Sequence, residues 1–99
     1  MIDLSSVLGF GWDDGNNRKN IKHGVSMAEA EQVFFNDPLL VVEDAKHSQQ
    51  EIRLHALGKT DSSRCLHIMF TLRKDGRKIR VISARDMHKK ERAFYDKAN

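Results

Sequence analysis

The spacing of apolar positions changes at Pro38, and this change separates a helical first part of the chain from a strand-rich second part. Before the proline, Ala30, Val33 and Phe34 recur at intervals of three or four, as residues do on one face of a helix. Ser26 and Glu29 have the spacing of a capping box, which marks a helix start. Because the residue before a proline is pushed out of the helical region, this helix must stop before Pro38.

The chain before Ser26 predicts a further helix. An aspartate at position 13 or 14 can cap a helix that runs to about residue 22, and Gly24 can end it in the left-handed conformation. Ahead of this segment, Phe10 and Trp12 alternate with glycines and are compatible with a short strand. Trp12 is expected in the core, with stacking on a nucleic-acid base as the alternative, and His23 is expected to cap the helix end rather than to catalyse a reaction.

After Pro38 the pattern predicts four strands, at residues 39–42, 51–57, 66–72 and 78–83, and then a last helix at 86–97. Asp75 and Gly76 are the residues that a two-residue hairpin turn prefers, because both of its central positions need positive φ. Short links between consecutive strands favour an antiparallel meander. The expected fold is therefore α+β, a single domain over 1–99, in which an antiparallel sheet of about four strands packs against two N-terminal helices and one C-terminal helix.

This hairpin, together with a symmetric loop around Asp61, sets an expected register. Its pairs are Thr71 with Arg80, Met69 with Ile82, Arg53 with Met69, and His55 with His67. Since side chains alternate across a strand, the register divides the sheet into two faces. The apolar face is expected to lie against the helices and holds Ile52, Leu54, Leu66, Ile68, Phe70, Ile79 and Val81. The polar face holds Glu51, Arg53, His55, His67, Met69, Thr71, Lys78, Arg80 and Ile82.

Composition narrows the setting of the protein. Its 99 residues are 39% hydrophobic, enough for one modest core. The single cysteine, Cys65, excludes an intrachain disulfide and favours a reducing compartment. No apolar run approaches the length of a membrane span, and the first residues lack the basic start of a secretory signal, so we expect a cytoplasmic protein without a membrane partner.

Charge is unevenly distributed along the chain. The net charge is +3, yet residues 1–72 carry 7 Lys/Arg against 10 Asp/Glu, whereas residues 73–99 carry 10 against 4. A cationic C-terminal region indicates a polyanionic partner. The alternative is a solvated basic helix that only keeps the protein soluble.

The polar sheet face is the first candidate site. Arg53 and Arg80 can bind a phosphate and stabilise the charge of a pentavalent phosphorane. Glu51, His55 and His67 can supply the acid and base that cleavage of RNA by its own 2′-hydroxyl needs. The alternative is an ordinary solvated face with cross-strand charge pairs. The two histidines lack a third ligand at motif spacing, so we expect neither a metal nor another cofactor.

The last helix is the second candidate, as an RNA-binding surface. His88, Arg92 and Tyr95 share one face of it. Tyr95 stacks on a base or donates a proton, or it seals the helix end against the core. At the junction with the preceding strand, Arg85 either contacts phosphate or caps strand carbonyls. Lys89 is a further RNA-binding candidate, or a general base if it is desolvated.

These segments together resemble one family. The matching pieces, in order, are Phe10-x-Trp12-Asp13, Asn20-x-Lys22-His23-Gly24-Val25-Ser26, Asp37-Pro38, Glu51-x-Arg53, Gly58, Ile82-Ser83-Ala84-Arg85, and Glu91-Arg92 followed by Tyr95. The chain is similar over nearly its whole length to BrnT, the toxin of BrnT/BrnA type II toxin–antitoxin systems. That resemblance implies a RelE-like fold and metal-independent endoribonuclease activity on mRNA that inhibits translation. It also implies neutralisation by a BrnA-like antitoxin, and operator DNA contacted only through the toxin–antitoxin complex.

By the same resemblance, Arg53, Arg80 and Arg85 match basic positions of the family. The chain departs from the family pattern at three places. Residues 1–9 are a possible N-terminal extension, Asn16 replaces a frequent lysine, and His55 replaces an aliphatic residue. Two other classes of function stay open, a nucleic-acid-binding regulator without catalysis and an interaction module whose basic patch docks an acidic protein. The sequence does not identify the general base.

Overall fold

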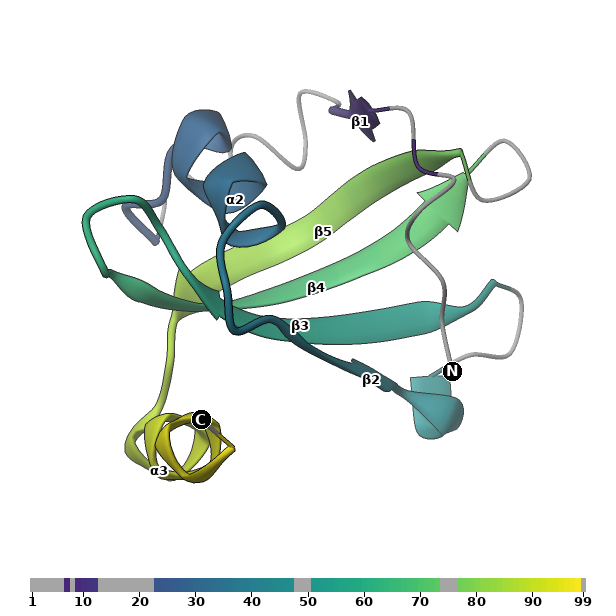
Figure 1. Ribbon diagram of the computed structural model, residues 1–99. Helices are drawn as coiled ribbons and strands as arrows, with labels where there is room; N and C mark the ends of the chain where they lie inside the picture. Colours follow the sequence, from purple (N-terminus) through teal and green to yellow (C-terminus); the bar gives the residue numbers. More distant parts are fainter. Residues whose placement is uncertain (1–6, 8, 13–22, 48–50, 74–76, 99) are drawn as a thin grey trace.

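The computed structural model describes residues 7, 9–12, 23–47, 51–73 and 77–98. Five strands within these ranges form one sheet in the order β1-β5-β4-β3-β2 (Figure 1). The elements are β1 (Gly9–Gly11), α2 (Met27–Val33), β2 (Leu40–Glu43), the 3-10 helix η1 (Ala45–His47), β3 (Arg53–Lys59), β4 (Cys65–Arg73), β5 (Lys78–Asp86) and α3 (Lys89–Lys97). The helix expected over residues 13–22 and the hairpin turn expected at Asp75 and Gly76 lie outside the described residues.

The sheet confirms the α+β class and corrects the number and direction of its strands. β2, β3, β4 and β5 form the expected antiparallel meander, but β1 is a fifth strand and runs parallel to β5, with Phe10 opposite Ile79. The prediction of an all-antiparallel, four-stranded sheet is therefore wrong. The sequence was compatible with a short strand around Phe10, but a three-residue strand has too little pattern to indicate its partner or direction. Phe10 takes its place by packing against the core.

The hairpin between β4 and β5 has the expected register near its turn and a different one farther along. Thr71 lies opposite Arg80, as predicted, whereas Met69 lies opposite Ser83 instead of Ile82. A β-bulge between Met69 and Phe70 causes the difference, since it leaves one extra residue on β5. β5 extends to Asp86, so the last helix begins at Lys89 and not at the expected position 86.

The register between β3 and β4 differs from the prediction by two residues. Arg53 lies opposite Thr71 and His55 opposite Met69, because the connecting loop is centred on Ser62 instead of Asp61. This loop closes with a 2.9 Å hydrogen bond from the Thr60 N–H to the Arg64 carbonyl. A shift of two residues keeps every side chain on its own face. Within β3 and β4 the predicted division into two faces is thus confirmed, although the predicted pairs between these two strands are not.

The apolar face packs under α2. The core consists of Val25, Ala30, Val33, Leu54, Ala56, Leu66, Ile68, Phe70, Ile79, Val81 and Ala84, all at most 2% exposed. Ile52, expected on this face, precedes β3 and is 53% exposed. The approach of α2 to the sheet depends on Gly58, since a Cβ there would lie 2.7 Å from Cγ1 of Val33.

The start of α2 shows the expected capping box. The Glu29 N–H donates to Oγ of Ser26 at 3.0 Å, and the Ser26 N–H donates to Oε1 of Glu29 at 3.1 Å. The structure also confirms the left-handed residue before this helix, because Gly24 has a φ of 69°.

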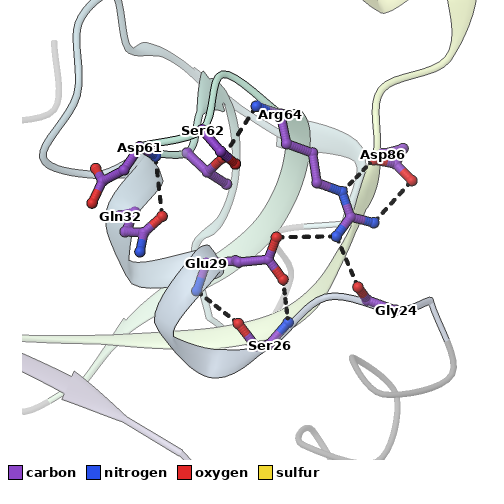
Figure 2. Close-up of polar contacts among 9 residues, drawn as sticks. Gly24, Ser26, Glu29, Gln32, Asp61, Ser62, Arg64 and Asp86 are labelled. Carbon is purple, nitrogen blue, oxygen red and sulfur yellow. Dashed lines mark hydrogen bonds and ion pairs between the residues drawn. The ribbon is translucent and has the colours of Figure 1, made fainter.

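Arg64 joins this helix start to the sheet (Figure 2). Its guanidinium makes two hydrogen bonds to Asp86, at 2.7 and 3.0 Å, and donates to the Gly24 carbonyl and to Glu29 at 2.8 and 3.1 Å. The pKa values of both carboxyls lie below their usual range. For Asp86 the main cause is the hydrogen bonding with Arg64. For Glu29 the main cause is the hydrogen bond from the Ser26 backbone N–H, and Arg64 lowers the pKa further. One side chain therefore ties together the β3–β4 loop, the end of β5 and the start of α2.

The last helix lies on the other side of the sheet from α2 (Figure 1). The expectation that all helices cover the apolar face is therefore wrong for α3, which rests on part of the polar face. Tyr95 is its anchor, 2% exposed, with its hydroxyl donating to the Pro38 carbonyl at 2.6 Å. The final helix has only this buried residue, so its own pattern of apolar positions did not indicate which face it covers. Neither described helix has the length and apolar character needed to cross a membrane.

Candidate functional site

The polar face of the sheet is organised in rows that cross the strands. In one row Thr71 of β4 lies between Arg53 of β3 and Arg80 of β5, and both arginines are partly exposed. Directly opposite residues on antiparallel strands point to the same side. Thr71 itself is fully buried and donates from its hydroxyl to the Ile52 carbonyl at 2.6 Å. The sheet thus presents two guanidinium groups from strands on either side of one fixed residue.

The next row adds charge beside this pair. Arg73 lies opposite Lys78 at the ends of β4 and β5, and its guanidinium forms a 3.3 Å ion pair with Glu51. Because position 51 precedes Arg53 by two residues, the carboxylate stands at the edge of the same group of cations. We call Glu51, Arg53, Arg73, Lys78 and Arg80 the cationic rows. Sequence reasoning included four of these five residues on the polar face and missed Arg73, which the predicted hairpin would have placed opposite Lys78.

The two candidate histidines come together farther along the same face. Nδ1 of His55 lies 2.8 Å from Nε2 of His67, although the residues are diagonal and not directly opposite. Nε2 of His55 lies 2.8 Å from Oδ2 of Asp44. Sequence reasoning missed Asp44, since it follows β2 and no register had been set for that strand. The result is a chain of hydrogen bonds from Asp44 through His55 to His67.

The direction of this chain follows from its end groups. A carboxylate only accepts, so His55 donates from Nε2 to Asp44, and a neutral His55 then accepts at Nδ1 from the N–H on Nε2 of His67. This assignment leaves Nδ1 of His67, which is buried without a hydrogen-bond partner, as an acceptor. The opposite direction would leave a buried N–H without an acceptor, which is rarer in proteins. Burial is the main cause that lowers the pKa of His67 to about 4, with the positive charge of Arg85 next, so this ring is neutral at pH 7.

Glu91 extends the cluster into α3. Its carboxylate accepts two hydrogen bonds from the Arg85 guanidinium, at 2.8 and 3.0 Å, and lies 4.0 Å from Nε2 of His67. It also accepts from the His88 N–H at 2.8 Å, at the start of the helix. Chiefly because of the Arg85 hydrogen bonds, the pKa of Glu91 falls to about 2. We call Asp44, His55, His67, Arg85 and Glu91 the histidine network, which fastens α3 to the sheet.

The predicted RNA-binding residues at the C-terminal end occupy different environments. Lys89 and Arg92 are exposed, and Arg92 forms an ion pair with Asp96 one turn away at 3.3 Å. Arg85 is engaged with Glu91, and the buried ring of Tyr95 is not accessible to a base. Among the alternatives for Tyr95, the structure favours the one in which it seals the helix against the core, since its hydroxyl donates to the Pro38 carbonyl.

The remaining candidates lie away from the polar face. The indole N–H of Trp12, which is half-buried against the core, donates to Oε2 of Glu31 at 2.8 Å. His23 is exposed beside Gly24. Among the described residues, no group of three His, Cys, Asp or Glu side chains is arranged to hold a metal ion.

The polar face therefore has two chemically different parts. The cationic rows suit a phosphate ester, because guanidinium groups bind its oxygens and bind them most strongly when negative charge accumulates on these oxygens. In the histidine network, both ring nitrogens of His55 already contact protein groups, and His67 is 7% exposed beneath α3. Of the acid and base candidates, Glu51 is the one that lies among the cations.

Comparison with known proteins gives a matching family and a similar solved structure. A sequence model of a family described as the ribonuclease toxin BrnT of type II toxin–antitoxin systems matches residues 12–91. The crystal structure of the ribonuclease toxin BrnT from Brucella abortus is similar in fold, with a TM-score of 0.62 and 23% sequence identity over 84% of this chain and 100% of that one. A search of curated proteins finds no similar sequence.

Proposed function

Because this chain belongs to the BrnT family of ribonuclease toxins of type II toxin–antitoxin systems, we propose that it cleaves mRNA, inhibits translation and is neutralised by a BrnA-like antitoxin. The observation that carries the proposal is the row in which Thr71 lies between Arg53 and Arg80. Two arginines on separate strands can bind different oxygens of one phosphate. In this proposal operator DNA is contacted only through the complex with the antitoxin, because the cationic rows serve RNA.

The proposed reaction involves only the RNA, the protein and one water molecule, which gives a proton to the leaving oxygen and receives in return the proton taken from the 2′-hydroxyl. The ribose 2′-oxygen loses its proton and attacks the adjacent phosphorus, and the bond from phosphorus to the 5′-oxygen breaks. The products are a 2′,3′-cyclic phosphate and a 5′-hydroxyl, whose proton comes from water. Arg53 and Arg80 stabilise the phosphorane formed between these steps, when its oxygens carry the most negative charge.

We assign the role of general base to Glu51. Its carboxylate is held by Arg73 at 3.3 Å at the edge of the cationic rows, next to the phosphate position. His55 and His67, the other two candidates, serve in this proposal to hold α3 and the sheet together. Lys89 and Arg92, exposed on α3, would contact RNA on either side of the cleaved bond without taking part in the chemistry.

Single-turnover cleavage of RNA by purified protein in EDTA tests this proposal. Arg53→Ala and Arg80→Ala should each slow cleavage by about 10²- to 10³-fold, as the loss of one group that stabilises the transition state typically does. Glu51→Gln should slow it similarly and remove the rise of rate with pH that reports a base. Arg77→Ala is the matched control, because it removes the same charge from an exposed position near the turn.

Three outcomes would contradict the proposal. Cleavage by the two arginine variants at the rate of wild type would remove Arg53 and Arg80 from the site. A defect in His55→Gln larger than that in Glu51→Gln, with an unchanged fold, would transfer the role of the base to the histidine network. Salt-sensitive binding of RNA by wild type without cleavage products would favour the non-catalytic alternative.

A further inference from the structure

The side of the protein opposite the cationic rows carries an exposed aromatic surface. Phe35, directly after α2, is 79% exposed and makes an edge contact with Phe10, their ring centroids 6.1 Å apart. Phe10 contacts Phe34 at 5.6 Å, and Phe34 contacts the buried Phe70 at 5.0 Å. We call Phe10, Trp12, Phe34 and Phe35 the aromatic patch. It is connected through ring contacts to the centre of the core.

The backbone around Phe35 is held in place. Its N–H donates to the Gln32 carbonyl at 3.0 Å, and the next side chain, Asn36, donates to the Lys59 carbonyl at 3.0 Å and to Asp61 at 2.9 Å. An exposed aromatic residue on a fixed backbone loses little conformational entropy when a partner covers it. Residues of this kind are typical anchors at the centre of protein interfaces.

Charge around the patch selects the partner. Residues 25–45 contain five carboxylates and no lysine, arginine or histidine. Glu29 among them is paired with Arg64, and Asp44 belongs to the histidine network. Near the patch, Glu31 accepts a hydrogen bond from the indole of Trp12, and Asp37 is exposed two residues after Phe35. An acidic surface repels RNA but complements a basic segment. The cationic rows and the aromatic patch therefore suit different partners.

We propose that the aromatic patch and its acidic surroundings dock a segment of the antitoxin with an apolar anchor flanked by lysine or arginine. This inference rests on the proposed function, since it concerns the partner of the same toxin. It places a contact of the antitoxin on the side of the sheet that carries α2, away from the residues that would bind RNA.

A second copy of this chain is a less suitable occupant. The only large apolar residue exposed on α3, Phe94, is 58% exposed among basic residues and complements the patch in charge. However, α2 and α3 lie on opposite sides of the sheet (Figure 1). A contact between them would join copies head to tail and would tend to propagate instead of closing. A closed complex is better explained by a different chain.

The experiment measures the dissociation constant for the antitoxin, obtained as the purified product of the reading frame adjacent to that of this chain. Phe35→Ser should raise this constant at least tenfold, and Asp37→Asn should raise it less and reduce its dependence on salt. Phe94→Ser is the matched control, an exposed aromatic residue on the other side of the sheet, and should leave binding unchanged. RNA cleavage by Phe35→Ser alone should equal that of wild type.

Hydrogen exchange gives a second measurement that does not depend on a variant. Amides of residues 27–36 should exchange more slowly in the wild-type complex than in the free toxin. Unchanged binding by Phe35→Ser, or unchanged exchange in this segment, overturns the inference and leaves the proposed ribonuclease activity intact. A change in self-association of Phe35→Ser without a change in antitoxin binding also overturns it. If wild type does not bind the adjacent product at all, the antitoxin part of the proposed function fails with it.

Discussion

Replacing His67 by glutamine should remove much of the acid sensitivity of this protein between pH 7.5 and pH 5. The ring is 7% exposed beneath α3, and burial, followed by the charge of Arg85, lowers its pKa from 6.5 to about 4. Glutamine stays neutral, and its amide can donate to Nδ1 of His55 from nearly the position of Nε2. The change therefore removes the titration and keeps the hydrogen bond.

The sign and size follow from proton linkage. Between pH 6.5 and pH 4 the unfolded chain binds a proton on residue 67 that the folded chain does not, so the free energy of unfolding falls as the pH falls. The difference between 6.5 and about 4 corresponds to a total of about 3 kcal/mol, at about 1.4 kcal/mol per pKa unit. By pH 5 about 2 kcal/mol of this should be lost, a large part of the stability of a small domain.

Urea unfolding followed by circular dichroism at pH 7.5, 6.5, 5.5 and 5 would measure this loss. The range stops at pH 5 because the Arg85–Glu91 pair contributes at lower pH. The pKa of Glu91 is lowered from 4.5 to about 2, so its stabilisation is complete above pH 4.5 and disappears only below that value. His23→Gln is the control, since it removes an exposed imidazole and leaves the buried one.

Equal pH dependence of His67→Gln and wild type would refute the reasoning. A wild-type protein with constant stability from pH 7.5 to pH 5 would refute it as well, because the buried ring could then accept a proton without cost. If His23→Gln flattened the profile as much as His67→Gln, the effect would not come from the histidine network.

Two further predictions concern the packing of α2 on the sheet. Gly58→Ala should lower the free energy of unfolding by about 1–3 kcal/mol in urea titration at pH 7, because its Cβ would lie 2.7 Å from Cγ1 and 3.3 Å from the carbonyl oxygen of Val33. A stability within about 0.5 kcal/mol of wild type, the size of a neutral surface change, would show that α2 moves aside. Arg64→Met should lower the free energy of unfolding by about 2 kcal/mol, because it loses the charge-assisted hydrogen bonds to Asp86 and Glu29. Arg64→Lys keeps the charge and should lower it by about 1 kcal/mol. Equal melting temperatures of the two variants would show that the geometry of the guanidinium is unimportant.

Local sequence was sufficient for much of the fold. The capping box of Ser26 and Glu29, the left-handed Gly24 and the stop before Pro38 depend on neighbouring residues, and the first two appear in the structure as hydrogen bonds and a positive φ. The alternation of apolar and polar residues set the two faces of the sheet. It survived an error of two residues in register, because such a shift does not move a side chain to the other face.

For the candidate site, the sequence likewise predicted the face of the sheet on which the residues lie but not the register between β3 and β4. Arg53 and Arg80 were placed on one face by alternation alone, and the structure brings both to the same row. Their shared neighbour, Thr71, required the register of β3, which depends on a loop centred on Ser62. The close contact of His55 with His67 was expected, but for a different pairing of the strands.

By itself the sequence determined α2, the four strands of the meander, the faces of the sheet, the uneven charge and, through the resemblance of its segments, the family. Tertiary structure alone decided that β1 joins β5, that α3 covers part of the polar face and that Asp44 and Glu91 enclose the two histidines. The physical reason is the range of the interactions. Helix caps and the alternation of apolar and polar residues act between residues a few positions apart. The position of α3 over the polar face instead depends on the hydrogen bond from Tyr95 to Pro38, two residues that are 57 positions apart in the chain.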